Sequence, residues 1–347
     1  MADITAEFVA AYLADKWGEP AQVEAAERHE RGISRESWFI TARRDTRGVE
    51  RLVLRRDLEG NSVGPGPLRF EYDVYRKLQG TGVPIAEALW WEENNAWAPA
   101  GRPFYVRRLV DGSWRIPHYA DPDPKYAPLR IEIGREHVRN LALVHQCDWR
   151  RHGFEEILPV PATESDCACV AIDRMYADLA RFQFSPLPIV TEMREWLLDN
   201  APAAPRICLL KGTNGLGEEV FRDNTIVAMS DWEQASLGDP AADFARTQDF
   251  FRDVLAEGRA IWGMRQALDF YAELTGVSIP LASVEYYRVL TIVENVISLH
   301  HGAVPIAERT DLSVRLSWLA TEVVFIGHRV MLDALSAGPA GPRRTSH

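Results

Sequence analysis

The feature that most constrains the fold of this chain is a change in its hydrophobic periodicity near residue 110. Before this point the apolar residues occur in short runs with β-type spacing, separated by polar or Gly/Pro-rich turns. These patterns predict an antiparallel hairpin formed by 37–41 and 51–55 and a helix over 68–78. They also predict two further strands, over 88–92 and 104–109. Beyond residue 130 apolar residues recur at helical spacing over long stretches. The sequence therefore predicts an α+β protein with two unlike lobes.

The two lobes have expected bounds. The strand-rich lobe is expected over 1–110, beginning with an amphipathic helix over 2–17, and the helical lobe over 111–337. Helices of the second lobe are predicted from Ile131, over 168–182 and 189–200, and from 241 onwards. Two short apolar runs, 207–210 and 226–229, lie on either side of a Gly-rich segment and predict a small hairpin. Residues 338–347, rich in Gly, Pro and Arg, are expected to be a disordered tail.

Composition and charge exclude several classes of function. The net charge of -11 argues against sequence-independent binding to nucleic acid, because such binding depends on neutralisation of phosphates by Lys and Arg. The four cysteines lack metal-ligand spacing and are expected to be reduced thiols of a cytoplasmic protein. No apolar run reaches transmembrane length, so no membrane partner is expected, and the oligomeric state is left open.

The segment from Lys211 to Glu219 contains three glycines and ends in two acidic residues. Glu218 and Asp231 flank one predicted hairpin, and a strand-loop-strand unit can bring its two ends together. These carboxylates could therefore share one Mg²⁺, a cation that prefers oxygen ligands. The alternative is a Gly-rich turn whose acids are solvated. Asp239 and Asp243 are interpreted first as ordinary helix caps.

Three segments carry a resemblance to a known family. The run from Asp231 to Ala245, DWEQASLGDPAADFA, resembles the metal-binding segment of the aminoglycoside phosphotransferase and choline kinase family. The run 141–145, LALVH, resembles the family's helix that ends in a Leu-His pair, with Val144 in the Leu position, and 270–276 resembles its late Tyr-containing helix end. The resemblance spans nearly the whole chain. It implies a two-lobed protein kinase-like fold, ATP and Mg²⁺ as cofactors, and a small-molecule substrate, expected to be a hydroxyl compound.

The resemblance also implies a nucleotide site in the first lobe. Arg55 lies where the family places the basic residue that touches nucleotide phosphates, and Glu71 lies where its helical ion-pair partner belongs. Gly32 and Ser34 lie in a turn that resembles the nucleotide-covering turn, and 104–112 resembles the hinge between the lobes. Without the family context, Arg55 and Glu71 would be expected to form only a surface salt bridge of small worth.

The catalytic loop departs from the family pattern, which reads His-Gly-Asp, four residues and then Asn. In this chain Lys211 stands for the His, Thr213 for the catalytic Asp, and Glu218 for the metal-binding Asn. Thr213 cannot act as the base that accepts a hydroxyl proton. Glu218 remains a competent ligand for Mg²⁺, and Lys211 can hold a phosphate or a substrate carboxylate as a point charge.

Three functions follow, in this order of preference. The first is an ATP-dependent phosphotransferase with a substitute base, Glu218 or Glu219, or with an acidic substrate that needs none. The second is a kinase fold repurposed for nucleotidylation or ligation, and the third is a non-catalytic pseudokinase that binds a ligand. An acidic surface suits a cationic substrate, whereas Arg107, Arg108 and Lys211 suit an anionic one. The predicted roles are catalytic for Lys211, Thr213 and Glu218, cofactor-binding for Gly32, Ser34, Arg55 and Glu71, and metal-binding for Glu218 and Asp231.

Overall fold

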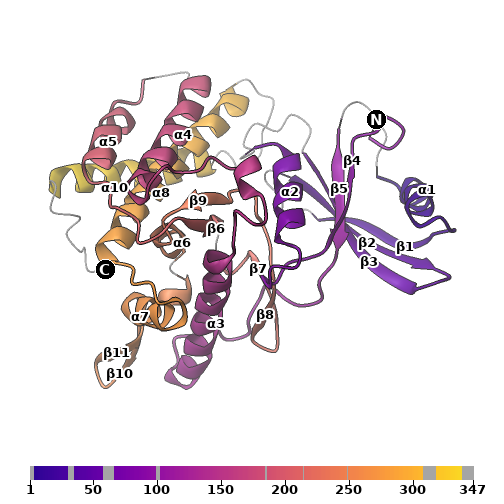
Figure 1. Cartoon of the computed structure of the whole chain (residues 1–347), viewed down its shortest axis with the longest axis horizontal. Helices are drawn as coiled ribbons and strands as arrows, with labels where there is room; N and C mark the ends of the chain where they lie inside the picture. The colour runs from indigo at the N-terminus through magenta and orange to yellow at the C-terminus, as the bar shows by residue number, and fades with distance from the viewer. Residues whose placement is uncertain are drawn as a thin grey trace.

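The computed structural model describes residues 4–29, 35–57, 66–98, 102–183, 186–213, 215–247, 249–307 and 318–337. A strand-rich lobe, at the right of Figure 1, lies beside a larger lobe that is mostly helical. The predicted α+β fold with two unlike lobes is confirmed. The boundary expected near residue 110 stays a prediction, and the expected tail at 338–347 lies outside the described residues.

The first lobe is built on a five-stranded antiparallel sheet in the order β1-β2-β3-β5-β4. Its strands are β1 (Gln22–His29), β2 (Arg35–Arg44), β3 (Gly48–Asp57), β4 (Ala88–Glu92) and β5 (Phe104–Arg108). In the β3–β5 pair, Leu54 lies opposite Val106 and Arg55 lies opposite Tyr105. Because side chains alternate along a strand, these two pairs face opposite sides of the sheet. One face is therefore apolar, and the other carries Arg55.

Helix α1 (Ala6–Trp17) packs on the apolar face of this sheet. It begins where the Thr5 hydroxyl accepts a hydrogen bond from the Phe8 amide at 3.2 Å, and it ends at Gly18, whose φ of 70° is left-handed. The Tyr12 ring lies 5.1 Å from the Phe104 ring, centroid to centroid. The helix expected over 2–17 is present, and the Thr5 cap explains why it begins at Ala6.

Helix α2 (Leu68–Leu78) has the predicted bounds and connects the two lobes. Its Tyr75 ring lies 6.2 Å from the Tyr105 ring on the second face of the sheet. Tyr75, Val74 and Leu78 also belong to the large apolar core of the second lobe. The helix is therefore fixed against both lobes, and so is Glu71 on its buried face.

The second lobe is mostly helical and contains three small β ladders (Figure 1). Its longer helices are α3 (Ala127–Gln146), α4 (Cys167–Phe182), α5 (Pro188–Asp199), α7 (Met264–Thr275), α8 (Leu281–Ala307) and α10 (Val324–Ala337), the last preceded by a π-helical turn at Leu319–Val323. No helix among the described residues has the length and apolar character needed to cross a membrane.

The hairpin predicted from 207–210 and 226–229 is wrong. The strand β6 (Cys208–Leu210) pairs with β9 (Ser236–Gly238), whereas β7 (Glu219–Arg222) pairs with β8 (Thr225–Met229). The reason is local: Asp223 and Asn224 have φ values of 51° and 61°, which form a tight two-residue turn between β7 and β8. Glu218 and Asp231 nevertheless flank one hairpin, as predicted.

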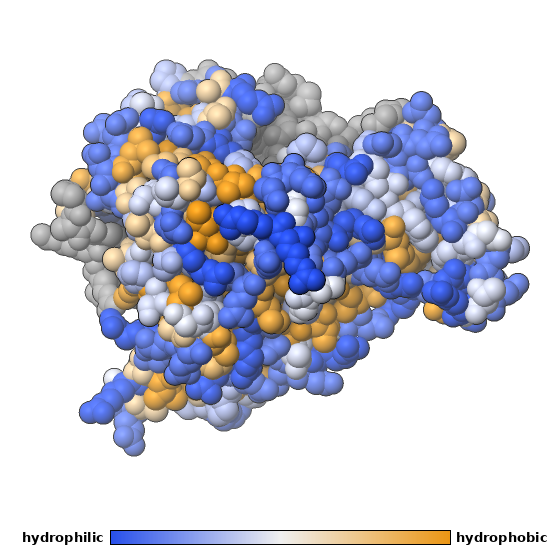
Figure 2. Space-filling view, viewed as in Figure 1, coloured by the Kyte–Doolittle hydropathy of each residue, from blue (hydrophilic) through white to orange (hydrophobic). Residues whose placement is uncertain are grey.

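The continuous helices predicted from 241 are also wrong. Helix α6 (Ala241–Arg246) is short, and a hairpin of β10 (Val254–Ala256) and β11 (Arg259–Trp262) follows it. Glu257 and Gly258 make its turn, with φ values of 50° and 75°. The hairpin projects at the lower left of Figure 1, and hydrophobic residues reach the surface there in Figure 2, where Leu255 and Ile261 are exposed.

Candidate functional site

Arg55 and Glu71 form an ion pair between the sheet and helix α2. The Arg55 Nη1 and Glu71 Oε1 atoms are 2.5 Å apart, and Glu71 is fully buried. Burial disfavours the charged guanidinium, but Glu71, Tyr105 and Asp231 outweigh it and raise the pKa of Arg55 well above its usual value. The pair is thus enclosed, unlike the solvated salt bridge of the alternative interpretation.

Glu218 and Asp231 meet at the open end of the β7–β8 hairpin. The backbone there is closed by Ser230, whose amide and hydroxyl donate to the Glu218 carbonyl at 2.9 and 2.8 Å. Burial, followed by repulsion from Asp231, raises the pKa of Glu218 to about 7. Asp231 has a left-handed backbone with a φ of 64°, a strained conformation for a residue other than glycine. The hairpin therefore holds the carboxyl groups of Glu218 and Asp231 close to each other at its open end.

Asp231 connects this carboxylate pair with the Arg55–Glu71 pair. Its charge acts on Arg55 and also, after burial, raises the pKa of Glu233 to about 8. The Glu233 carboxylate lies 3.8 Å from Nε of the buried Arg35. Glu233 had no predicted role. Its position two residues after Asp231, in the turn that leads to β9, is the signal that could have placed it in the site.

The two pairs, Arg55 with Glu71 and Glu218 with Asp231, fit a divalent cation bound beside phosphate. The buried Asp231 Oδ1 atom has no hydrogen-bond partner among the described residues, and Glu218 supplies a second carboxylate beside it. Mg²⁺ commonly takes one or two carboxylates together with phosphate oxygens, and no cluster of three or more metal-ligating side chains is found in the described ranges. The donor set therefore suits Mg²⁺ that arrives with a nucleotide.

Asp243 anchors the start of the catalytic loop, at Lys211 and Gly212. Its two carboxylate oxygens accept hydrogen bonds from the Lys211 and Gly212 amides at 2.8 and 2.9 Å. His145 Nε2 lies 3.0 Å from Asp243, and its Nδ1 lies 3.0 Å from the Tyr271 hydroxyl. Although burial opposes it, the hydrogen bond with His145 helps to hold the pKa of Asp243 below its usual value. Asp243 is thus a loop anchor, not the helix cap first expected.

Two neighbouring positions show why their residue types are needed. Asp239 is a cap as expected, because its Oδ1 accepts the Ala241 amide at 2.9 Å. Gly212 has a φ of 82°, and a Cβ atom there would lie 2.2 Å from the Gln234 carbonyl oxygen. Only glycine allows this close approach between the catalytic loop and the segment after Asp231.

Lys211 points into the protein. Its side chain is fully buried, its ammonium donates to the Thr213 carbonyl oxygen, and it lies 3.8 Å from the Glu219 carboxylate. Burial raises the pKa of Glu219 to about 8, although Lys211 opposes the shift. His137, from α3, lies 3.9 Å from Glu219, and burial lowers its pKa to about 3. These contacts favour a structural role for Lys211. The contact of Lys211 with a phosphate or a substrate carboxylate stays a prediction.

Thr213 follows directly on this buried cluster. Its Oγ1 atom is buried and has no hydrogen-bond partner within the described part of the chain. The hydroxyl thus remains able to donate to a ligand. Gly32 and Ser34, the remaining predicted site residues, lie outside the described residues.

The segment after β5 is joined to the β7–β8 hairpin. The Ser113 amide donates to the Phe221 carbonyl oxygen and the Phe221 amide donates to the Ser113 carbonyl oxygen, both at 2.8 Å. A Cβ atom on Gly112 would lie 2.7 Å from that Phe221 oxygen. The predicted hinge therefore contacts the hairpin whose ends carry Glu218 and Asp231.

Solved structures resemble this chain over most of its length. A candidate aminoglycoside phosphotransferase from Ralstonia eutropha aligns with a TM-score of 0.68 and 19% identity, covering 94% of this chain and 97% of the other. The gentamicin complex of APH(2'')-IIa aligns with a TM-score of 0.58 and 14% identity, covering 96% and 97%. These likenesses show a shared fold.

Sequence relatives and a family model are consistent with this fold. Acyl-CoA dehydrogenase family member 10 of Mus musculus is 25% identical over 199 residues, which are 56% of this chain and 18% of the mouse protein. Acyl-CoA dehydrogenase family member 11 of Gallus gallus is 22% identical over 292 residues, or 79% and 36%. The chain thus spans only a minor part of these relatives. A model described as the phosphotransferase enzyme family matches residues 25–274, and the chain belongs to this family.

Proposed function

We propose that this chain is an ATP-dependent phosphotransferase that acts on a small molecule. The observation that carries the proposal is the meeting of two ion-binding pairs, Arg55 with Glu71 and Glu218 with Asp231, linked by the charge of Asp231. Arg55 would hold nucleotide phosphates, and Glu71 would hold Arg55. Phosphoryl transfer depends chiefly on such positioning and on charge stabilisation.

Relatives with the same fold support a nucleotide and a small acceptor. Variants of APH(4)-Ia were solved as ternary complexes of hygromycin B with ADP or AMP-PNP, with TM-scores of 0.51 and 0.52. A Brachybacterium faecium relative is named as a macrolide 2'-phosphotransferase, with a TM-score of 0.54. A cytoplasmic location belongs to the same proposal, in keeping with the four free cysteines.

Mg²⁺ would be held by Glu218 and Asp231. Such an ion, when bound, neutralises charge on the transferred phosphoryl group. The partnerless Asp231 Oδ1 atom and the adjacent Glu218 carboxylate are the groups that support this assignment. Glu218 would bind the metal more strongly than the Asn of the family pattern, because it adds a negative charge.

The loop has no carboxylate at position 213 to act as the general base. Glu219 is fully buried behind the loop next to Lys211, so it is unsuited to remove a proton from an acceptor. Glu218 is only partly buried, but its carboxylate is also needed by the metal. For the expected hydroxyl acceptor, Glu218 would have to serve both roles. Thr213 at the base position also favours the two other readings, a different ATP-dependent transfer and a non-catalytic binding protein.

The test measures nucleotide binding and products together. Calorimetry with Mg·ATP should give at least tenfold weaker binding for Asp231→Asn and Glu218→Gln, since each removes a charged ligand from the metal. Asp223→Asn is the matched control, an exposed acid at the tip of the same hairpin. Unchanged affinity in both site variants would refute the proposal. Mass spectrometry then distinguishes ADP with a phosphorylated product from AMP, which would indicate the repurposed transfer, and from no turnover, which would indicate the binding protein.

A further inference from the structure

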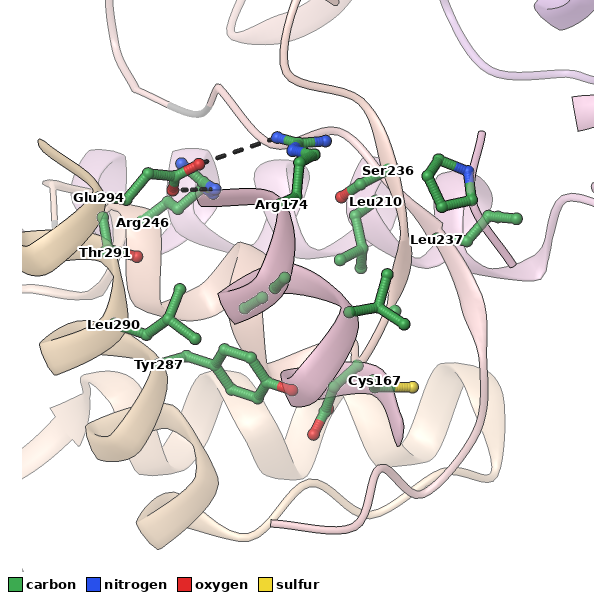
Figure 3. Close-up of a pocket in the computed structure, with 16 residues that line it drawn as sticks. Cys167, Arg174, Leu210, Ser236, Leu237, Arg246, Tyr287, Leu290, Thr291 and Glu294 are labelled. Atoms are coloured by element: carbon green, nitrogen blue, oxygen red, sulfur yellow. Dashed lines mark hydrogen bonds and ion pairs between the residues drawn. The ribbon is translucent and has the colours of Figure 1, made fainter. Parts of the chain in front are cut away.

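A pocket lies beside the catalytic loop, between helices α4, α6 and α8 and the β6–β9 pair (Figure 3). Its two long walls have the same spacing: Cys167 and Arg174 lie seven residues apart in α4, as do Tyr287 and Glu294 in α8. Seven residues span about 10 Å of helix. In Figure 3 Cys167 and Tyr287 lie at one end of the two helices and Arg174 and Glu294 at the other. We call the buried end at Cys167 and Tyr287 the base, and the end at the more exposed Arg174 the mouth. The cavity has a volume of about 50 Å³.

The mouth of the pocket is positively charged. Glu294 accepts a hydrogen bond from Arg246 at 2.7 Å, whereas its distance to the Arg174 guanidinium is 3.8 Å, too long for a hydrogen bond. Arg246 is also held by the Gln234 side chain at 2.9 Å. One carboxylate thus faces two guanidinium groups among the residues that line the mouth, and Arg174 keeps donors for a second anion.

The mouth is the end of the pocket nearest the catalytic loop. Leu210 and Ser236 form the last pair of the β6–β9 ladder, both line the pocket, and Lys211 follows Leu210 directly. Gln234, which holds Arg246, carries the carbonyl oxygen against which Gly212 packs. A chain of contacts therefore links the positive mouth to the loop that contains Thr213.

We propose that this pocket binds the phosphoryl acceptor and that the acceptor is a small carboxylic acid whose carboxylate receives the phosphoryl group. The proposal rests on the proposed function and names its substrate class. The apolar walls, among them Val170, Leu237 and Leu290, take the carbon chain of the acid, and Arg174 takes its carboxylate. One carboxylate oxygen attacks the γ-phosphorus of ATP, the bond from this phosphorus to the β–γ bridging oxygen breaks, and an acyl phosphate and ADP result.

This acceptor resolves the absence of a base. A carboxylate is already deprotonated at neutral pH, so its phosphorylation releases no proton and requires no catalytic Asp. Thr213, with its partnerless hydroxyl, can donate a hydrogen bond to the acceptor, whereas an Asp at this position would repel a carboxylate. The replacement at position 213 is thus the one that an anionic acceptor requires.

The base of the pocket adds a second preference. Asp239 is almost completely buried there, with the Tyr287 side chain beside it. A ligand with a hydroxyl or amino group at the far end of its carbon chain would donate to the Asp239 carboxyl group. Such acids should bind more tightly than plain acids of the same length.

The experiment compares acids with alcohols of the same carbon skeleton. The wild-type protein is given Mg·ATP with straight-chain acids from propanoate to decanoate, the matching alcohols, and the ω-amino form of each acid. ADP is measured, and hydroxylamine traps any acyl phosphate as a hydroxamate. We expect hydroxamate with acids of intermediate length, no product from the alcohols, and lower KM for the ω-amino forms. With heavy-oxygen-labelled acid, one labelled oxygen should appear in the released phosphate.

Variants separate the inference from the proposed function. Arg174→Gln should raise KM for the acid about tenfold or more with kcat nearly unchanged, because a charge-assisted hydrogen bond is lost. Arg174→Lys should lose less, and Arg181→Gln, on the same helix outside the pocket, should match the wild type. Thr213→Asp should lower activity with the acid.

Each contrary result has a clear meaning. ADP release with alcohols and none with acids, or higher activity in Thr213→Asp, would overturn the carboxylate acceptor and leave the phosphotransferase standing. Retained ATP binding with no turnover of any acid would also overturn the inference. Absence of Mg·ATP binding itself would instead overturn the proposed function.

Discussion

The buried pair of Lys211 and Glu219 permits a quantitative test of how the altered loop is held. The two charged groups are 3.8 Å apart and fully buried, so their attraction is about 4 kcal/mol at an effective dielectric constant of about 20. Removing one partner leaves the other charge buried and should cost about 3–5 kcal/mol of unfolding free energy. The double variant Lys211→Met/Glu219→Gln avoids this penalty, so its loss should be much smaller than the sum of the two single losses.

The assay is urea unfolding of the wild type, both single variants and the double variant, followed by tryptophan fluorescence. Trp232 is buried, with its ring 5.7 Å from the Lys211 ammonium, so it should report on this region. Measurements at about pH 9 keep Glu219 charged, because its pKa is about 8. We expect a coupling energy of about 3 kcal/mol. The hydrogen bond from Lys211 to Thr213 is lost in every variant that lacks Lys211, so it does not enter the coupling. A coupling energy below about 0.5 kcal/mol would refute the reasoning.

Three further predictions concern the surroundings of the loop. Gly212→Ala should cost about 2 kcal/mol or more in urea unfolding, through left-handed strain and the clash with a carbonyl oxygen, whereas Gly217→Ala, with open space around it, should change stability by less than about 0.5 kcal/mol. The pKa of His137 is about 3 in the folded protein and 6.5 in the unfolded chain, so only the unfolded chain takes up a proton as the pH falls between these values. The wild type should therefore lose about 2 kcal/mol more unfolding free energy than His137→Phe between pH 6.5 and roughly pH 5. The same dependence of unfolding free energy on pH in both proteins would contradict this. Arg55→Met should weaken Mg·ATP binding about tenfold in calorimetry and Arg55→Lys less, and equal binding by all three proteins would remove Arg55 from the nucleotide site.

The parts of the site that the sequence predicts are those set by local register. Arg55 is reached along one strand and Glu71 along one helix, so the family pattern was enough to place both, and the structure joins them. Glu218 and Asp231 flank a single tight hairpin, so only its short-range pairing had to be known. Their roles in binding nucleotide and metal stay predictions.

The parts that could not be predicted depend on packing between distant segments. His137 lies in α3, far from Glu219 in sequence, and only the folded second lobe brings the two within 3.9 Å. The inward direction of Lys211 follows from this packing, whereas the sequence shows only a basic residue in a loop. The pairing of β6 with β9 depends in the same way on a contact across the Gly-rich loop and the β7–β8 hairpin. The turn at Glu257 and Gly258, by contrast, depends only on neighbouring residues.

The two backbone hydrogen bonds between Ser113 and Phe221 limit how the lobes can move. They attach the segment after β5 to the β7–β8 hairpin, and Gly112 packs directly against the same strand. If the sheet rotates relative to the helical lobe, this segment can therefore bend only between β5 and Gly112. The segment beyond Gly112 would travel with the carboxylates of Glu218 and Asp231, while Arg55 would travel with the sheet. Opening the molecule would thus pull Arg55 away from Glu218 and Asp231 and leave these two carboxylates together.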